Sequence, residues 1–241
     1  MKSNILTTGS LYIILFLMPC APVFGGQSAA ELTADLAAGK LKAAQICSNC
    51  HGMDGQASRG GNSAISPKIT AQRKSFLVAR LKKYKSGKIQ HPQMSLVAKM
   101  VSDEDINNVS EWYSRIKVES PWFSEERIAS VMTGNLGDDQ LSPELLAGRL
   151  KAIQVCSNCH GVNGQAGSAG NSSIVPNLTA QHKEHLTARL KDYQSGKIKH
   201  DQMSFIAKML TPQDIDNVSA WYSSIEVTVI DPELELSSQN E

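Results

Sequence analysis

Cys47-Ser48-Asn49-Cys50-His51-Gly52 occurs a second time as Cys156-Ser157-Asn158-Cys159-His160-Gly161. Two thiols separated by two residues and followed at once by an imidazole are typical of covalent haem attachment, in which the histidine binds the iron. A zinc site would need two such pairs at one ion, or further histidines at finger-like spacing. A redox-active cysteine pair would sit in a strand–helix setting, which this chain does not offer. The motifs therefore predict two covalently bound haem c groups.

The repeat extends far beyond the motif. Cys47 and Cys156 lie 109 positions apart (156 − 47), and the same offset relates Trp112 to Trp221. No insertion or deletion interrupts the match between residues 39–116 and 148–225, so each repeat is a whole domain rather than one unit of a solenoid. We predict one domain at 27–118, a linker at 119–139 and a second domain at 140–227.

Residues 1–26 have the pattern of a secretion signal. Lys2 gives a positive start, residues 11–18 are apolar, and Val23-Phe24-Gly25 supplies small residues near a cleavage point. The apolar run is too short to span a bilayer, which argues against a retained membrane anchor. Cys20, the fifth cysteine, lies inside this signal. The sequence therefore predicts a mature protein exported to the periplasm, with four cysteines for the two haems and no disulfide.

Charge and composition exclude a nucleic-acid partner. The formal net charge of the chain is +1, far from the strong basic excess that a nucleic-acid footprint needs.

Residues 228–241 are acidic and polar and are predicted to form a disordered tail. In the linker, the apolar pair Trp122-Phe123 raises the hypothesis that these rings pack between the domains and fix the spacing of the haems.

The periodicity of each repeat predicts an all-α fold. The expected helices cover residues 31–44, 74–85 and a third segment opening at Ser102, with counterparts at 143–153, 183–194 and from Thr211. The third helix begins with a capping signature in both repeats. Gly39 and Gly148 are costly inside a helix, so we expect another helix to approach them closely. No stretch alternates well enough to predict a strand.

The second axial ligand of each iron decides between electron carrier and catalyst. Met94 and Met203 lie in an irregular stretch between the second and third helices, where a loop could fold over the far side of the haem. Met100 and Met209 are interpreted as core methionines. His91 and His200 stay open as rival ligands, because imidazole also binds low-spin iron. A backbone carbonyl near Pro67, and its counterpart near Pro176, could orient the proximal histidine, although an ordinary loop proline is an equal alternative.

Together these residues resemble the two-domain, dihaem class I cytochromes c of the cytochrome c4 type. The resemblance is carried by the paired C-S-N-C-H-G motifs, by residues 67–72 and 176–181, and by Met94 eight residues ahead of the capped helix. It implies haem attachment at Cys47, Cys50, Cys156 and Cys159, proximal ligands at His51 and His160, and distal ligands at Met94 and Met203. It also implies a proline carbonyl bonded to each proximal histidine, and a crossing of the first and last helices at Gly39, near Trp112 or Tyr113. The family usually has glycine where Ala71 and Ala180 stand.

This resemblance implies a periplasmic electron carrier and not an enzyme. Its expected partners are redox proteins: a quinol-oxidising complex or a dehydrogenase as donor and a membrane oxidase or reductase as acceptor, with peripheral membrane association possible. An alternative is the dihaem subunit of a larger dehydrogenase, such as a flavin-containing sulfide dehydrogenase. A dihaem peroxidase would need one haem to lose its distal ligand, and the matched methionines argue against it.

Overall fold

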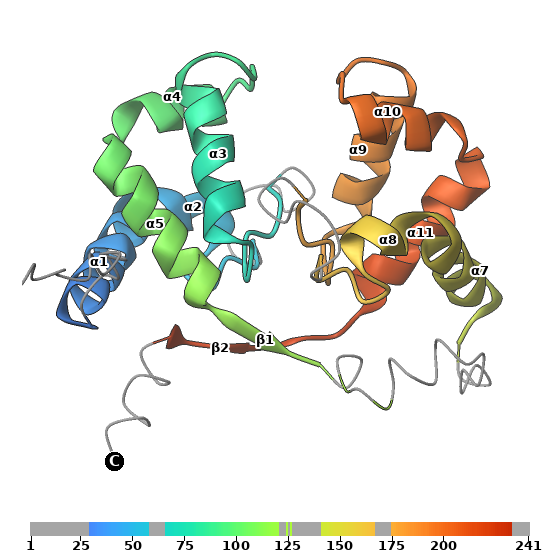
Figure 1. Ribbon diagram of the computed structural model, residues 1–241, viewed down its shortest axis with the longest axis horizontal. Helices are drawn as coiled ribbons and strands as arrows, with labels where there is room; N and C mark the ends of the chain where they lie inside the picture. Colours follow the sequence, from blue (N-terminus) through green and yellow to red (C-terminus); the bar gives the residue numbers. More distant parts are fainter. Residues whose placement is uncertain are drawn as a thin grey trace, which may run out of the picture.

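The computed structural model describes residues 29–57, 66–120, 124, 126, 141–166 and 175–232. Two helical halves stand side by side above a short two-stranded sheet (Figure 1). The predicted secretion signal, the pair Trp122-Phe123 and residues 233–241 lie outside the described residues.

The same order of helices occurs in both halves, as the offset of 109 predicts. The first half contains α1 (Ala29–Lys42), the π-helical turn η1 (Ala43–Cys47), α2 (Ser48–His51), α3 (Lys74–Lys85), α4 (Met94–Met100) and α5 (Asp103–Arg115). The second half contains α7 (Pro143–Lys151), the π-helical turn η4 (Ala152–Cys156), α8 (Ser157–His160), α9 (Lys183–Gln194), α10 (Asp201–Lys208) and α11 (Pro212–Ser224). The predicted all-α class is confirmed, and α3 and α9 have the predicted bounds.

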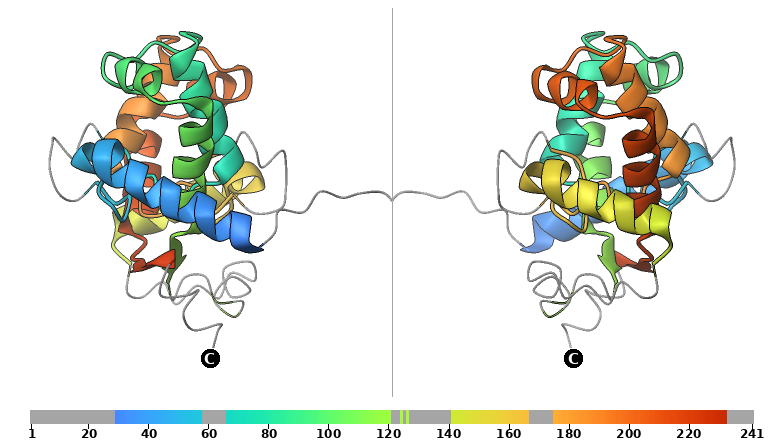
Figure 2. Two further views of the ribbon diagram at one scale, coloured as in Figure 1. Left: turned by 90° about the vertical axis from the view of Figure 1, so that its left-hand side faces the viewer. Right: turned by 90° about the vertical axis from the view of Figure 1, so that its right-hand side faces the viewer.

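The first and last helices of each half cross at a glycine. A Cβ built on Gly39 of α1 would lie 2.0 Å from the Asn108 carbonyl oxygen of α5, and one on Gly148 of α7 would lie 2.0 Å from the Asn217 carbonyl oxygen of α11. No side chain fits at such a distance, so glycine is required at both crossings. Figure 2 shows the α1–α5 crossing from one end of the molecule and the α7–α11 crossing from the other. Trp112 and Trp221, each 2% exposed, pack at these crossings.

Helices α5 and α11 both begin with the predicted capping box. The Ser102 hydroxyl accepts from the Asp105 backbone N–H, and the Asp105 carboxylate accepts from the Ser102 N–H. Thr211 and Asp214 repeat both bonds at the start of α11. Each box satisfies two backbone donors that the first helical turn leaves unpaired.

The halves are joined by a sheet that the sequence did not predict. Strand β1 (Lys117–Glu119) pairs antiparallel with β2 (Thr228–Ile230), with Val118 opposite Val229. The expectation of no strand was wrong because three residues are too few for alternation to be recognisable. The predicted disordered tail was wrong over β2 for the same reason, and Pro232 just beyond it is buried. None of the described helices is both long and apolar enough to cross a membrane.

Candidate haem sites

Each C-x-x-C-H motif sits where a helix changes its winding. Helix α1 continues into η1, which ends at Cys47, and the chain then tightens into α2, which ends at His51. The second half repeats this with η4, Cys156, α8 and His160. In both motifs the first cysteine is half-buried and the second is exposed, and all four thiols are free. A π-helical turn is uncommon and is frequently found at functional sites.

The motif histidines are buried and oriented. His51 is 8% exposed, and its Nδ1 lies 2.9 Å from the Pro67 carbonyl oxygen. His160 is 7% exposed, and its Nδ1 lies 3.0 Å from the Pro176 carbonyl oxygen. A carbonyl can only accept a hydrogen bond, so Nδ1 carries the proton. Nε2 then has a lone pair with which it can bind a metal. Burial lowers the pKa of both histidines, which favours the neutral, ligating form.

The first thiol of each pair is not an activated nucleophile. Burial raises the pKa of Cys47 and of Cys156 to about 11. A thiol–disulfide catalyst needs the opposite shift, because the thiolate is the attacking species. The burial of the first thiol therefore argues against a redox-active cysteine pair. Two free thiols beside a buried, preoriented imidazole with a bare Nε2 fit a covalently attached haem.

Aromatic residues of the last helix hold the loop behind each motif. The Trp112 indole N–H donates to the Met53 carbonyl at 3.2 Å, and the Tyr113 hydroxyl donates to the Gly52 carbonyl at 3.0 Å. Trp221 and Tyr222 make the equivalent bonds to Val162 and Gly161. These hydrogen bonds were not predicted from the sequence. The repetition of the aromatic residues at the offset of 109 was the available signal, but it did not reveal the acceptors.

Both predicted distal methionines lie in the first turn of a short helix and not in an irregular loop. Met94 is the first residue of α4, and Met203 lies in α10; both are half-buried. The rival ligand His91 accepts the Met94 backbone N–H on its Nδ1 at 3.2 Å, and His200 accepts that of Met203 at 3.3 Å. His200 is therefore the N-cap of α10, whereas His91 bonds the first residue of α4 from two positions before that helix's N-cap, Gln93.

Met100 and Met209 are not core residues. They are 71% and 57% exposed, respectively. Each follows an exposed apolar residue by four positions, Leu96 in α4 and Phe205 in α10, so each pair lies on the same outward face of its helix. The expectation failed because a methionine's place depends on which helical face is covered, and α4 and α10 were not predicted.

His185 of α9 is partly buried among cationic groups. Burial, followed by the charges of Arg189, His182, Arg80 and His51, lowers its pKa to about 4. Arg80 and His51 belong to the first half, so the first half also influences the pKa of this histidine.

Comparison with known proteins gives a consistent result. The cytochrome c family profile matches residues 148–226. Cytochrome c-554(548) of Halomonas halodenitrificans is 36% identical over 77 residues, which are 31% of this chain and 88% of that protein. Cytochrome c4 of Thiocapsa roseopersicina is 28% identical over 207 residues, 83% of this chain and 98% of that protein. The crystal structure of reduced cytochrome c4 from Pseudomonas stutzeri superposes with a TM-score of 0.56 at 21% identity, covering 79% of this chain and 98% of that one.

Proposed function

Because this chain belongs to the cytochrome c family and is of the dihaem cytochrome c4 type, we propose that it is a periplasmic carrier that passes single electrons between respiratory redox proteins. Cytochromes of this type are electron carriers and not enzymes. The observation that carries the proposal is the repeated geometry of the motif histidine, buried and bonded through Nδ1 to a proline carbonyl in both halves.

The proposed roles follow from the positions of the residues. Each haem would be attached through thioethers in one half, with the motif histidine as proximal ligand and a methionine as distal ligand. These residues are Cys47, Cys50, His51 and Met94 in the first half, and Cys156, Cys159, His160 and Met203 in the second. The bound haems supply the one-electron chemistry, and the chain supplies ligands, orientation and burial. With both axial positions filled, neither centre would offer a site for a substrate.

The partners are proposed as classes. A quinol-oxidising complex or a dehydrogenase would donate electrons, and a membrane oxidase or reductase would accept them. Export through residues 1–26 would place the protein in the compartment where such partners meet.

Haem counting and ligand binding test the proposal. Pyridine haemochrome analysis of the mature protein should give two haem c per chain, and Cys156→Ser/Cys159→Ser should give one. The matched change Cys47→Ser/Cys50→Ser should also leave one. Carbon monoxide should bind neither reduced centre of the unaltered protein at neutral pH. Fewer than two haems, or ready binding of carbon monoxide to both centres, would refute a dihaem electron carrier.

A further inference from the structure

The peptide group that orients each proximal histidine is also bonded from the other half of the molecule. The unit linking Pro67 to Lys68 has its carbonyl bonded to His51 Nδ1, as described above. The N–H of the same unit donates to the side-chain Oε1 of Gln181 at 2.9 Å. Gln181 also donates through Nε2 to the Lys68 carbonyl at 3.0 Å. A side chain of the second half therefore hydrogen-bonds the backbone segment whose carbonyl orients the histidine of the first half.

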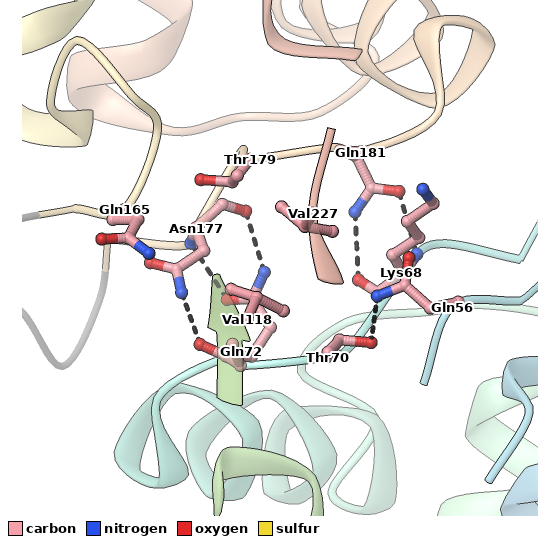
Figure 3. Close-up of a pocket in the computed structure, with 11 residues that line it drawn as sticks. Gln56, Lys68, Thr70, Gln72, Val118, Gln165, Asn177, Thr179, Gln181 and Val227 are labelled. Atoms are coloured by element: carbon pink, nitrogen blue, oxygen red, sulfur yellow. Dashed lines mark hydrogen bonds between the residues drawn. The ribbon is translucent and has the colours of Figure 1, made fainter. Parts of the chain in front are cut away.

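The arrangement is reciprocal. The unit linking Pro176 to Asn177 bonds His160 through its carbonyl, and its N–H donates to Gln72 Oε1 at 3.0 Å. Gln72 donates in turn to the Asn177 carbonyl at 2.8 Å. Figure 3 shows Gln72 beside Asn177 and Gln181 beside Lys68, on either side of Val118 and Val227. Gln72 and Gln181 are separated by the repeat offset of 109 (181 − 72), so the two contacts are related by the duplication.

Both glutamines are placed to act electrostatically. Gln72 is 5% exposed and Gln181 is 6% exposed, so their amides are shielded from competing water. In such surroundings consecutive hydrogen bonds polarise one another. An acceptor on the peptide N–H makes the carbonyl of that peptide a stronger acceptor. The carbonyl then draws the Nδ1 proton more strongly and makes the imidazole a better electron donor through Nε2.

We propose that Gln72 and Gln181 are positioning residues that tune the proximal histidine of the opposite half, through the Pro176–Asn177 and Pro67–Lys68 peptides respectively. Each half thereby sets the reduction potential of the haem in the other. This inference rests on the proposed function, because it takes His51 and His160 as iron ligands. It goes beyond that function by naming residues that link the two centres.

The test uses Gln181→Leu and Gln72→Leu in the full-length mature protein. Redox titration followed by NMR of the haem methyl groups gives the potential of each centre separately. Gln181→Leu should raise the potential of the first-half centre and shift the Nδ1 proton of His51 in the reduced, diamagnetic state, while the His160 signal stays in place. Gln72→Leu should do the converse. In Gln181→Glu a carboxylate can still accept the Lys68 N–H, so the first-half potential should not rise.

Val118→Ala and Val227→Ala are the matched controls, because both side chains line the same contact region without bonding either peptide. Neither should move a histidine signal. The inference is overturned if Gln181→Leu leaves both potentials unchanged, shifts the centre of its own half, or shifts both centres equally, as general loosening of the contact would. A wild-type protein with fewer than two haems would instead refute the proposed function, before any variant is made.

Discussion

The two halves of the molecule have the same hydrogen bonds around the C-x-x-C-H motif and differ in the ion pairs that link α3 to α5 and α9 to α7 and α11. The histidine–proline bond, the aromatic bonds to the loop and the capping box occur in both. In contrast, Glu111 of α5 is buried and binds Lys74 and Arg115, at 2.9 and 2.6 Å, whereas Ala220 occupies the same place in α11. Lys183, the counterpart of Lys74, pairs instead with the more exposed Glu144 and Asp216.

The difference separates what the haem site requires from what only stabilises a half. Bonds that fix the histidine and its loop are duplicated without change, as is the ion pair of Lys42 with Asp105, which recurs as Lys151 with Asp214. The ion pairs of Glu111 have no counterpart, because Ala220 takes its place. Substitutions at duplicated positions should therefore have equal effects in the two halves, and substitutions at unmatched positions should affect one half alone.

Gly39→Ala and Gly148→Ala should have the largest effects and should be equal. A Cβ 2.0 Å from a carbonyl oxygen would force the crossing helices apart in either half. We expect each change to lower the free energy of unfolding by about 3 kcal/mol, at the upper end of the overpacking range. Denaturant unfolding of both variants measures it. Gly196→Ala is a control for added mass without crowding, because nothing lies within 4 Å of a Cβ there. Its φ of +77° costs alanine about 1–2 kcal/mol, so its loss should stay below that of both crossing variants. A loss below 1 kcal/mol at either crossing would contradict the required close approach.

Met94→Ala and Met203→Ala test whether the two iron centres are equivalent. Loss of a thioether ligand should lower the potential of one haem by about 0.1 V or more, within the roughly 0.8 V range that axial ligands command. That shift corresponds to about 2.3 kcal/mol for one electron. Potentiometric titration of each variant measures it, with Met100→Ala and Met209→Ala as exposed controls. If a control rather than the paired variant lowered a potential, the distal ligand would have been wrongly assigned.

Acid should destabilise the first half more than the second. Burial tends to raise the pKa of Glu111, but hydrogen bonds and charges from Lys74 and Arg115 outweigh it and hold the pKa below its ordinary value. A carboxyl with a lowered pKa in the folded state stabilises fully above its unfolded pKa, and the contribution is lost as pH falls through the folded value. Asp105 and Asp214 are shifted in the same direction in both halves, so their effects largely cancel in the comparison.

Hydrogen exchange of the α5 and α11 amides at pH 6 and at pH 3.5 measures this difference. Protection of α5 should fall more than that of α11, and Glu111→Ala, which copies the second half, should narrow the gap. The gap need not vanish, because the pKa of Asp103 is also lowered, first by its hydrogen bond from Lys85. Equal losses in the unaltered protein would show that the Glu111 ion pairs contribute no pH-dependent stability.

Local features of the chain could be predicted from the sequence, and contacts between distant segments could not. The bounds of α3, the capping box at Ser102 and the need for Gly39 follow from patterns within a few residues. The sheet between β1 and β2, the bond from Trp112 to Met53 and the contact of Gln181 with Lys68 depend on tertiary packing. From the sequence, Pro67 could equally mark a carbonyl that orients the histidine or be an ordinary loop proline. Only the structure shows the hydrogen bond between its carbonyl and His51.

The smallest predicted effect concerns the two alanines that precede Gln72 and Gln181. Ala71 and Ala180 have φ values of +52° and +55°, in the left-handed region that favours glycine. An L-residue there costs about 1–2 kcal/mol, whereas glycine loses about 0.5–1 kcal/mol of chain entropy on folding. Ala71→Gly and Ala180→Gly should therefore each stabilise the protein by about 0.5 kcal/mol, measured by denaturant unfolding at constant m-value. Both alanines donate their N–H to the carbonyl of the last-helix tyrosine, Tyr113 or Tyr222, and glycine keeps that bond. A loss of stability at either site would mean that the alanine methyl group contributes more packing energy than its backbone strain costs. Each alanine directly precedes Gln72 or Gln181, so unchanged haem potentials in these variants would also show that the glutamine contacts tolerate a relaxed backbone.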